Sequence, residues 1–302
     1  AYTKAAPYSA AQNMGRHRLV LGLLAVQPGM LAMLASAATI NVSPGAGTLQ
    51  SAHDSATAGD TLVLADGTYT GSGTEVLQIG KHITIQAANA GKAILDGENA
   101  RTGITTASAP TVIITGLSVT KCTGGISNAD GGTLTISSCQ VYDNSQGVFI
   151  WGSGTNTFNN CDIFRNAGGY GGGLYQSGGT LVLDTCRIYE NRAAQGAGLY
   201  FDGNAANAGY TEATLNNCQI YSNVADEAGG GVFFRATSDI TSSALLTMVD
   251  TPVHSNSAGE YGGGLYINGG TITLNKALVS GNTAFGAYGA TAGSTAGTGA
   301  NV

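Results

Sequence analysis

The sequence predicts an all-β solenoid in which each coil adds short strands to parallel sheets, that is, a parallel β-helix. A unit of about 22 to 33 residues recurs from Gly103 to about Gly289, and a unit of this size must stack on its neighbours to bury an apolar face. Within a unit, Leu181, Leu183 and Ile188 alternate with polar residues, a period of two that is typical of strands. The 47 glycines are too many for helical repeats.

The repeats form columns when they are aligned on Cys186. The column of Cys186 contains Leu117, Cys139, Cys161, Cys186, Cys218, Thr251 and Ala277. Five positions later the column contains Cys122, Asn144, Asn166, Asn191, Asn223, Asn256 and Asn282. Apolar columns pass through Leu183, Ile188 and Leu199. We interpret these columns as side chains that stack from coil to coil and fill the core.

The cysteine column is interpreted as a buried thiol ladder. Stacked parallel strands place equivalent residues ~4.8 Å apart with parallel Cβ vectors, whereas a disulfide needs converging Cβ atoms ~3.8 Å apart. Leu117 and Ala277 occupy the same column in other coils, which indicates packing. A metal site is not expected, because the column offers no nitrogen or oxygen ligands in an open geometry. Cys122 stands at the start of the asparagine column, where the sequence assigns it no role.

The asparagine column is predicted to be structural. Asparagine tolerates left-handed backbone geometry, and its amide can bond to neighbouring turns. A stack of such amides would satisfy backbone groups that a bend leaves without partners. We therefore expect these residues to support a corner of the solenoid and to bind no ligand.

Length and composition indicate one elongated domain. A chain of 302 residues would average about two domains, but a repeat array grows by adding coils. We therefore predict a single β-helix over residues 39–289. Hydrophobic residues make up 43% of the chain, which argues against disorder. The net charge is −6 and no Lys or Arg cluster is present, so nucleic acid is not expected as a partner.

The segment 1–38 precedes the repeats. It contains a basic stretch at 15–18, an apolar run from Leu19 to Leu34 and the small residues Ala35–Ala37, which is the layout of a secretory signal peptide that starts at Met14. The alternative is an apolar helix that caps the first coil. If the segment is retained, it is the only part of the chain expected to contact a membrane.

The signal-peptide interpretation predicts a secreted or cell-surface protein. Residues 290–302 are rich in Ala, Gly, Thr and Ser and are expected to form a flexible tail. The oligomeric state does not follow from the sequence.

Residues 48–97 resemble a known family. Thr48 to Ala58 is predicted to be a short helix, and the stretch from Gly59 to Tyr69 is followed by Ile83–Ile85 and Ile94–Gly97. This order is similar to the amino-terminal coils of the pectin-lyase-like superfamily. The resemblance implies a right-handed parallel β-helix, and it implies little about activity.

The later repeats resemble those of chlamydial polymorphic outer membrane proteins. They combine a Gly-Gly-apolar sequence, as at Gly172–Leu174, with an apolar-x-x-Asn sequence, as at Ile188–Asn191. The resemblance implies a surface β-helix with a role in adhesion. This chain departs from that family because its sequence shows no carboxy-terminal membrane barrel.

Two aromatic columns accompany the apolar ones. The first contains Tyr142, Phe164, Tyr189, Tyr221 and His254, and the second contains Phe149, Tyr175, Tyr200, Phe233 and Tyr266. Strand alternation from Ile188 predicts that the first column points outward. Its rings would either shield the ladder beneath them or bind the faces of sugar rings. Tyr142, Phe164, Tyr189 and Tyr221 are the candidate ligand-binding residues.

Two further outward patterns are present. Asp143, Arg165 and Glu190 share one column, and Asp162 and Arg187 share another, so opposite charges are predicted to be vertical neighbours. Such pairs are poor candidates for catalysis.

Threonines form columns on a further face. One runs through Thr111, Thr133, Thr155, Thr180 and Thr271, and the next contains Thr135, Thr157, Thr214, Thr247 and Thr273. The pattern is similar to the flat faces of β-helical ice-binding proteins, although Glu212 and Leu245 interrupt it. Ice binding is a minor alternative.

An enzymatic role is the main alternative. The Asn-Thr-Asp, Asp-Asp and Gly-His-Gly sequences that resemble polygalacturonase sites are absent. A lyase needs a base and either acidic groups or Ca²⁺ to neutralise the uronate, so a calcium cofactor is expected only under this alternative. The candidate catalytic residues are Asp226, Glu227, Arg235, Asp250 and His254. Extra residues between Phe201 and Thr211 and between Arg235 and Ala244 would form loops on one face.

The sequence thus predicts a secreted or surface β-helix with a structural, adhesive or glycan-binding role and no catalysis. Its expected partner is a polysaccharide or a cell-surface glycan. The alternative is a polysaccharide lyase or glycoside hydrolase.

Overall fold

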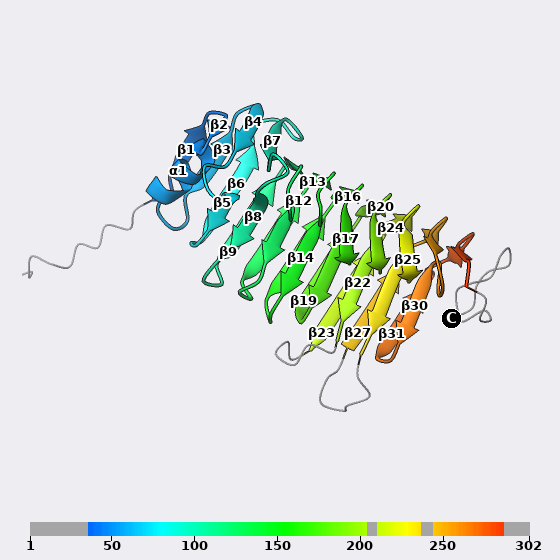
Figure 1. Ribbon diagram of the computed structural model, residues 1–302. Coiled ribbons are helices and arrows are strands. Elements are labelled where there is room, and N and C mark those ends of the chain that lie inside the picture. The colour runs from blue at the N-terminus through cyan, green and yellow to red at the C-terminus, as the bar shows by residue number, and fades with distance from the viewer. Residues whose placement is uncertain (1–35, 204–209, 237–243, 287–302) are drawn as a thin grey trace, which may run out of the picture. The chain divides into compact units, whose positions relative to one another are not determined.

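The chain folds into a parallel β-helix, as the repeats predict (Figure 1). The computed structural model describes residues 36–203, 210–236 and 244–286. From Ala37 onward these residues lie in one unit. The predicted tail at 290–302, most of the predicted N-terminal segment and the centres of both predicted loops lie outside the described residues.

Two ten-stranded parallel sheets extend over all coils. Sheet A contains β1 (Thr39–Val42), β3 (Thr61–Leu64), β6 (Ile83–Ala87), β9 (Thr111–Thr115), β12 (Thr133–Ser137), β15 (Thr155–Asn159), β19 (Gly179–Asp184), β23 (Thr211–Asn216), β27 (Ala244–Val249) and β31 (Thr271–Asn275). Sheet B contains β2 (Gly45–Ala46), β4 (Gly67–Thr70), β7 (Ala93–Asp96), β10 (Leu117–Thr120), β13 (Gln140–Tyr142), β16 (Asp162–Phe164), β20 (Arg187–Tyr189), β24 (Gln219–Tyr221), β28 (Val253–His254) and β32 (Val279–Ser280).

Sheet C closes the coil with eight strands. They are β5 (Glu75–Ile79), β8 (Thr102–Thr106), β11 (Ile126–Asn128), β14 (Val148–Trp151), β18 (Leu174–Ser177), β22 (Leu199–Asp202), β26 (Val232–Arg235) and β30 (Leu265–Asn268). Their inward side chains meet those of sheets A and B in a single core. Tyr69, Phe158, Phe201 and Phe234 are the largest fully buried residues of this core.

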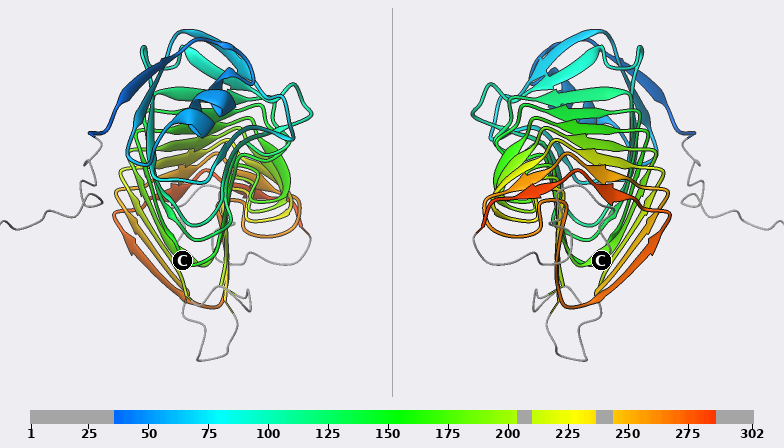
Figure 2. Two further views of the ribbon diagram at one scale, coloured as in Figure 1. Left: turned by 90° about the vertical axis from the view of Figure 1, so that its left-hand side faces the viewer. Right: turned by 90° about the vertical axis from the view of Figure 1, so that its right-hand side faces the viewer.

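A fourth sheet, which the sequence did not predict, lies outside this core. Sheet D contains β17 (Ala167–Tyr170), β21 (Arg192–Gln195), β25 (Val224–Ala228), β29 (Ser257–Ala258) and β33 (Thr283–Ala284). In the end-on views of Figure 2, the later coils bulge out here as a small lobe. The lobe covers the second aromatic column, because Tyr175, Tyr200 and Phe233 are buried together with Ala228.

Each coil bends through left-handed residues at two corners. The bend between sheets A and B uses Ser138, Asn160, Thr185, Asn217, Asp250 and Lys276, with φ between 46° and 56°. The bend after sheet B uses Lys121, Asp143, Arg165, Glu190, Ser222 and Ser255, with φ between 51° and 57°. The ladder asparagines themselves do not take the left-handed conformation. The residue before each asparagine takes that conformation, which turns the asparagine side chain inward.

The asparagines form a continuous hydrogen-bonded ladder beneath the second bend. The Asn166 backbone N–H and its Nδ2 both donate to Asn191 Oδ1, at 3.0 and 3.1 Å. Asn191 Nδ2 in turn donates to the Ile163 carbonyl at 3.0 Å. The same pattern links Asn144, Asn166, Asn191, Asn223, Asn256 and Asn282, all of them at most 4% exposed. Cys122 begins the ladder, since its N–H donates to Asn144 Oδ1 at 2.9 Å.

The cysteine column makes a similar ladder at the first bend. The N–H of Cys161 donates to Cys186 Sγ at 3.4 Å, and the N–H of Cys186 donates to Cys218 Sγ at 3.4 Å. Thr251 continues the pattern, because its Oγ1 accepts the N–H of Cys218 at 3.1 Å. All five cysteines are buried and unbridged. Burial raises the pKa of Cys139 to about 11 and that of Cys122 to about 12, so both thiols stay protonated.

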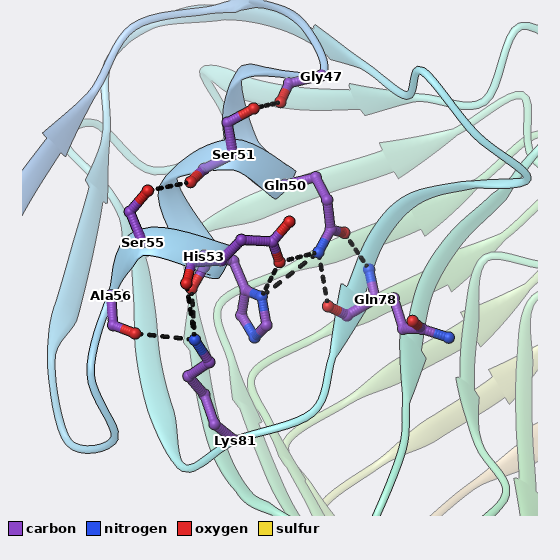
Figure 3. Close-up of polar contacts among 9 residues, drawn as sticks. Gly47, Gln50, Ser51, His53, Ser55, Ala56, Gln78 and Lys81 are labelled. Carbon is purple, nitrogen blue, oxygen red and sulfur yellow. Dashed lines mark hydrogen bonds and ion pairs between the residues drawn. The ribbon is translucent and has the colours of Figure 1, made fainter.

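The helix α1 (Thr48–Ser55) covers the amino-terminal end of the core, within the residues predicted to be helical. Leu49 and His53 are its buried residues. Figure 3 shows how the helix is fastened: Gln50 exchanges hydrogen bonds with the backbone of Gln78, and Lys81 Nζ donates to the His53 and Ala56 carbonyls. The carboxyl end of the helix dipole is partly negative, so the ammonium group of Lys81 is stabilised there.

Candidate functional site

Three of the five candidate catalytic residues lie apart from one another. Asp226 projects from sheet D and forms an ion pair with Arg192, both side chains being exposed. Asp250 lies at the bend between sheets A and B, where its φ is 46°. His254 belongs to sheet B and stacks on Tyr221 with a centroid distance of 5.4 Å. These residues share no site.

The other two, Glu227 and Arg235, line one hollow of about 270 Å³ between sheets C and D. We call it the crease hollow. Its lining residues are Gln195, Glu227, Ala228, Phe233, Arg235, Glu260, Tyr261, Tyr266 and Asn268. The sequence did not single out Glu260, although the repeat register contained the signal. Glu227 and Glu260 each stand four residues after a ladder asparagine, and the Glu260 N–H donates to the Glu227 carbonyl at 2.7 Å.

Arg235 is a fixed cation at the edge of the hollow. Its Nε and a terminal nitrogen donate to the two carboxylate oxygens of Asp202 at 3.0 and 2.9 Å. Its guanidinium also lies 5.7 Å from the centre of the Tyr200 ring. The hydrogen bond to Asp202 raises the pKa of Arg235 above its already high value. Arg235 therefore stays protonated and cannot abstract a proton.

Glu227 is the second charged residue of the hollow that a hydrogen bond holds in place. Gln195 Nε2 donates to Glu227 Oε2 at 2.6 Å, which orients the carboxylate along the lobe. Glu227 and Glu260 are both exposed on the wall of sheet D. Because Arg235 is balanced by Asp202, the two glutamates give the hollow a net negative charge.

Two tyrosine rings also line the hollow, Tyr266 from sheet C and Tyr261 from the segment that pairs with Ala228 of sheet D. Tyr266 stacks on Phe233 with a centroid distance of 4.8 Å and an interplanar angle of 28°. Tyr261 is tilted against Tyr266 at 6.0 Å and 43°. Tyr266 ends the aromatic column of sheet C within the part of the chain that the structure describes, so one of its faces has no further ring stacked on it there.

The first aromatic column lies half-buried on the outer side of sheet B. Its centroids are 4.8 to 5.4 Å apart, with interplanar angles of 1° to 10°. Six-membered rings this close and nearly parallel contact one another through their faces. The faces of Phe164, Tyr189 and Tyr221 are therefore occupied by neighbouring rings. This geometry suits the shielding role proposed for the column better than sugar stacking.

The charged columns have the predicted register. Arg165 makes two hydrogen bonds to Asp143 at 2.8 and 3.0 Å, and Arg187 makes two to Asp162 at 2.7 and 2.6 Å. Each pair is exposed enough to contribute only ~0.2–1 kcal/mol.

The threonine columns face outward on sheet A. Thr133, Thr155 and Thr180 are register partners, and Glu212 and Leu245 then interrupt the column. Ice binding stays a prediction.

Neither a metal cluster nor a membrane helix is found among residues 36–203, 210–236 and 244–286. No group of three or more His, Cys, Asp or Glu side chains is placed to hold a metal ion there. No helix in these ranges is long and apolar enough to cross a membrane.

Comparison with known families shows the handedness of the β-helix and the family of the chain. Residues 102–301 match the family model described as a right handed beta helix region. The chain belongs to this right-handed β-helix family. The match includes the repeats, the crease hollow and both ladders. A comparison with curated protein sequences finds no match.

Solved structures of this right-handed β-helix type include polysaccharide lyases. The pectate lyase Pel9A is 16% identical with a TM-score of 0.54, and the alignment covers 80% of this chain and 78% of that enzyme. This likeness shows a pectin-lyase-like fold and nothing of the activity.

Two alginate lyases are more distant in structure. The enzyme from Paenibacillus sp. str. FPU-7 is 18% identical with a TM-score of 0.44, over 78% of this chain and 99% of that one. The PL6 family enzyme AlyGC is 17% identical with a TM-score of 0.46, over 82% of this chain and 40% of that one. The chain thus spans less than half of AlyGC. The likeness of the repeats to chlamydial outer membrane proteins stays a prediction.

Proposed function

We propose that this right-handed β-helix is a secreted or cell-surface glycan-binding module without catalytic activity, and that the crease hollow holds a sugar ring. The observation that carries the proposal is the convergence of two tyrosines, two carboxylates and two amides on one hollow. Small-ligand sites combine aromatic walls with a few convergent polar groups in this way.

The chemistry of the lining residues suggests the sugar class. The Tyr266 ring lines the hollow and offers an apolar surface for the C–H groups of a pyranose, and Glu227, Glu260 and Asn268 offer partners for hydroxyl groups. The net negative charge of the hollow repels uronates at short range. The preferred ligand is therefore a neutral or amino sugar, in contrast to the pectate and alginate after which the similar lyases are named.

Replacing Tyr266 with alanine is expected to weaken binding at least about tenfold, which corresponds to about 1.4 kcal/mol. The measurement is a glycan array that contains neutral, amino and uronic acid oligosaccharides, followed by calorimetry with the best ligand. Tyr210→Ala is the control, because Tyr210 is an exposed tyrosine beside sheet A, outside the hollow. Unchanged affinity in the Tyr266 variant, or a preference for uronic acids, would contradict the proposal.

A glycoside hydrolase is the second candidate, and one observation favours it. Glu227 and Glu260 bring two carboxylates from adjacent coils into one hollow, and glycosidases use such a pair as acid and as base or nucleophile. A lyase is disfavoured, since the lining contains neither Lys nor His and Arg235 is held protonated by Asp202.

Activity assays separate the two candidates. We expect no new reducing ends and no unsaturated ends from neutral or acidic polysaccharides. Release of reducing ends that is lost in both Glu227→Gln and Glu260→Gln would replace the binding proposal with hydrolysis.

A further inference from the structure

A second hollow lies in another part of the fold from the crease hollow. It has a volume of about 680 Å³ and follows the bend between sheets A and B. One side is formed by Ser138, Asn160, Thr185 and Asn217, the left-handed residues of four successive coils. We call this hollow the corner groove.

The other side of the corner groove repeats at the same spacing. Gln140, Asp162, Arg187 and Gln219 are register partners in sheet B and face the bend. Stacked parallel strands place such residues ~4.8 Å apart. The groove therefore presents two parallel rows of polar side chains along the axis of the solenoid, rather than a single pocket.

The amino-terminal end of the groove is walled by the turn that contains Ala90, Gly91 and Lys92. The turn is fixed to the coil that follows, because the Gly91 N–H donates to the Gly116 carbonyl at 2.7 Å. Ser118 Oγ donates to the Gly91 carbonyl at 3.3 Å. These hydrogen bonds hold the turn in place at this end of the groove.

The charges in the groove are nearly balanced. Asp162 and Arg187 neutralise each other through two hydrogen bonds, which leaves Lys92 at the end wall as the one remaining charged lining residue. The side chains of Asn217 and Gln219 make no hydrogen bond to any residue that the structure describes, and both are exposed. Apart from Lys92 at its end, the groove offers neutral amides and hydroxyls along its length, so it suits an extended ligand that is rich in hydroxyl groups and that needs no charge of its own.

We propose that the corner groove binds a linear neutral polysaccharide along the solenoid axis, with successive sugar units facing successive coils. The proposal goes beyond the crease hollow, because it uses sheets A and B and shares no residue with that site. With both sites filled, one molecule would link two glycan chains, which raises avidity on a polymer surface.

Size-defined oligosaccharides test the proposal directly. The probes are the di- to hexasaccharides of β-1,4-linked glucose, mannose and xylose, measured by calorimetry with the full chain. Affinity should rise with length and level off when the groove is full, and it should be nearly independent of salt, because no ion pair forms with the ligand. If none of the three series binds with this length dependence, the proposal is overturned.

A double variant locates the binding. Asn217→Gly with Gln219→Ala should lower the affinity at least tenfold, since glycine keeps the left-handed backbone while both amides are removed. Gln146→Ala, an amide outside the groove, is the matched control and should bind as the wild type does. Loss of binding in Tyr266→Ala but not in the double variant would assign the ligand to the crease hollow, which overturns the groove proposal and supports the proposed function.

Discussion

Replacing Asn191 with alanine should lower the free energy of unfolding by about 3 to 5 kcal/mol. The side chain accepts from the Asn166 N–H and donates to the Ile163 carbonyl, and it is 1% exposed. Alanine leaves the buried Asn166 N–H without an acceptor, which costs about 1–3 kcal/mol, and it also removes the side-chain hydrogen bonds to the Ile163 carbonyl and to Asn223. The coils on both sides lose a fixed bend, so the effect should extend beyond one residue.

Guanidinium denaturation followed by circular dichroism measures this change. Asn159→Ala is the control, because Asn159 lies half-buried on the outer side of sheet A and makes no side-chain hydrogen bond to a described residue. We expect the control to remain within about 0.5 kcal/mol of the wild type. Equal midpoints for the two variants would show that the ladder does not support the coils.

Replacing Gly198 with alanine should destabilise the fold by about 3 kcal/mol or more. A Cβ atom at this position would lie 2.4 Å from the Gly231 carbonyl oxygen and 3.0 Å from Asn223 Nδ2. Both neighbours are held by the next coil, since Gly231 is backbone and Asn223 belongs to the ladder. The alanine can be accommodated only if adjacent coils separate, which breaks hydrogen bonds of sheet C.

Gly169→Ala is the matched control for this glycine. An added Cβ there meets no atom within 4 Å, and alanine restricts the unfolded chain more than glycine does. Its thermal midpoint should equal or slightly exceed that of the wild type. If Gly198→Ala melts at the temperature of Gly169→Ala, close approach of the coils is not the reason why a glycine precedes the first residue of the sheet C strand, as Gly198 precedes Leu199.

Most of the core follows from single residues in the repeat. Leu183, Cys186 and Ile188 are buried because strand alternation and the repeat length direct their side chains to the inside of the coil. The outward charges of Asp162 and Arg187 follow from the same register. Sequence position alone suffices here, since every coil repeats the same local choice.

The candidate site follows much less directly. The repeat predicted stacking of aromatic residues, but it did not reveal that sheet D folds back over Tyr200 and Phe233 and leaves Tyr266 at a hollow. Glu227 and Arg235 were candidates from separate strands, and no local pattern indicated that they line the same hollow. Asp226 was an equal candidate by sequence, yet its neighbour Arg192 holds it away on the outside of the lobe.

The sequence by itself determined the solenoid, the register of its coils and the two ladders, because these depend on a residue pattern that recurs in every repeat. Only the tertiary structure decided where left-handed residues turn the chain, that a lobe lies outside the core, and which polar side chains meet in a hollow. Those features depend on how far the chain between two successive columns projects from the core in each coil. That distance is set by packing between coils, which no single repeat encodes.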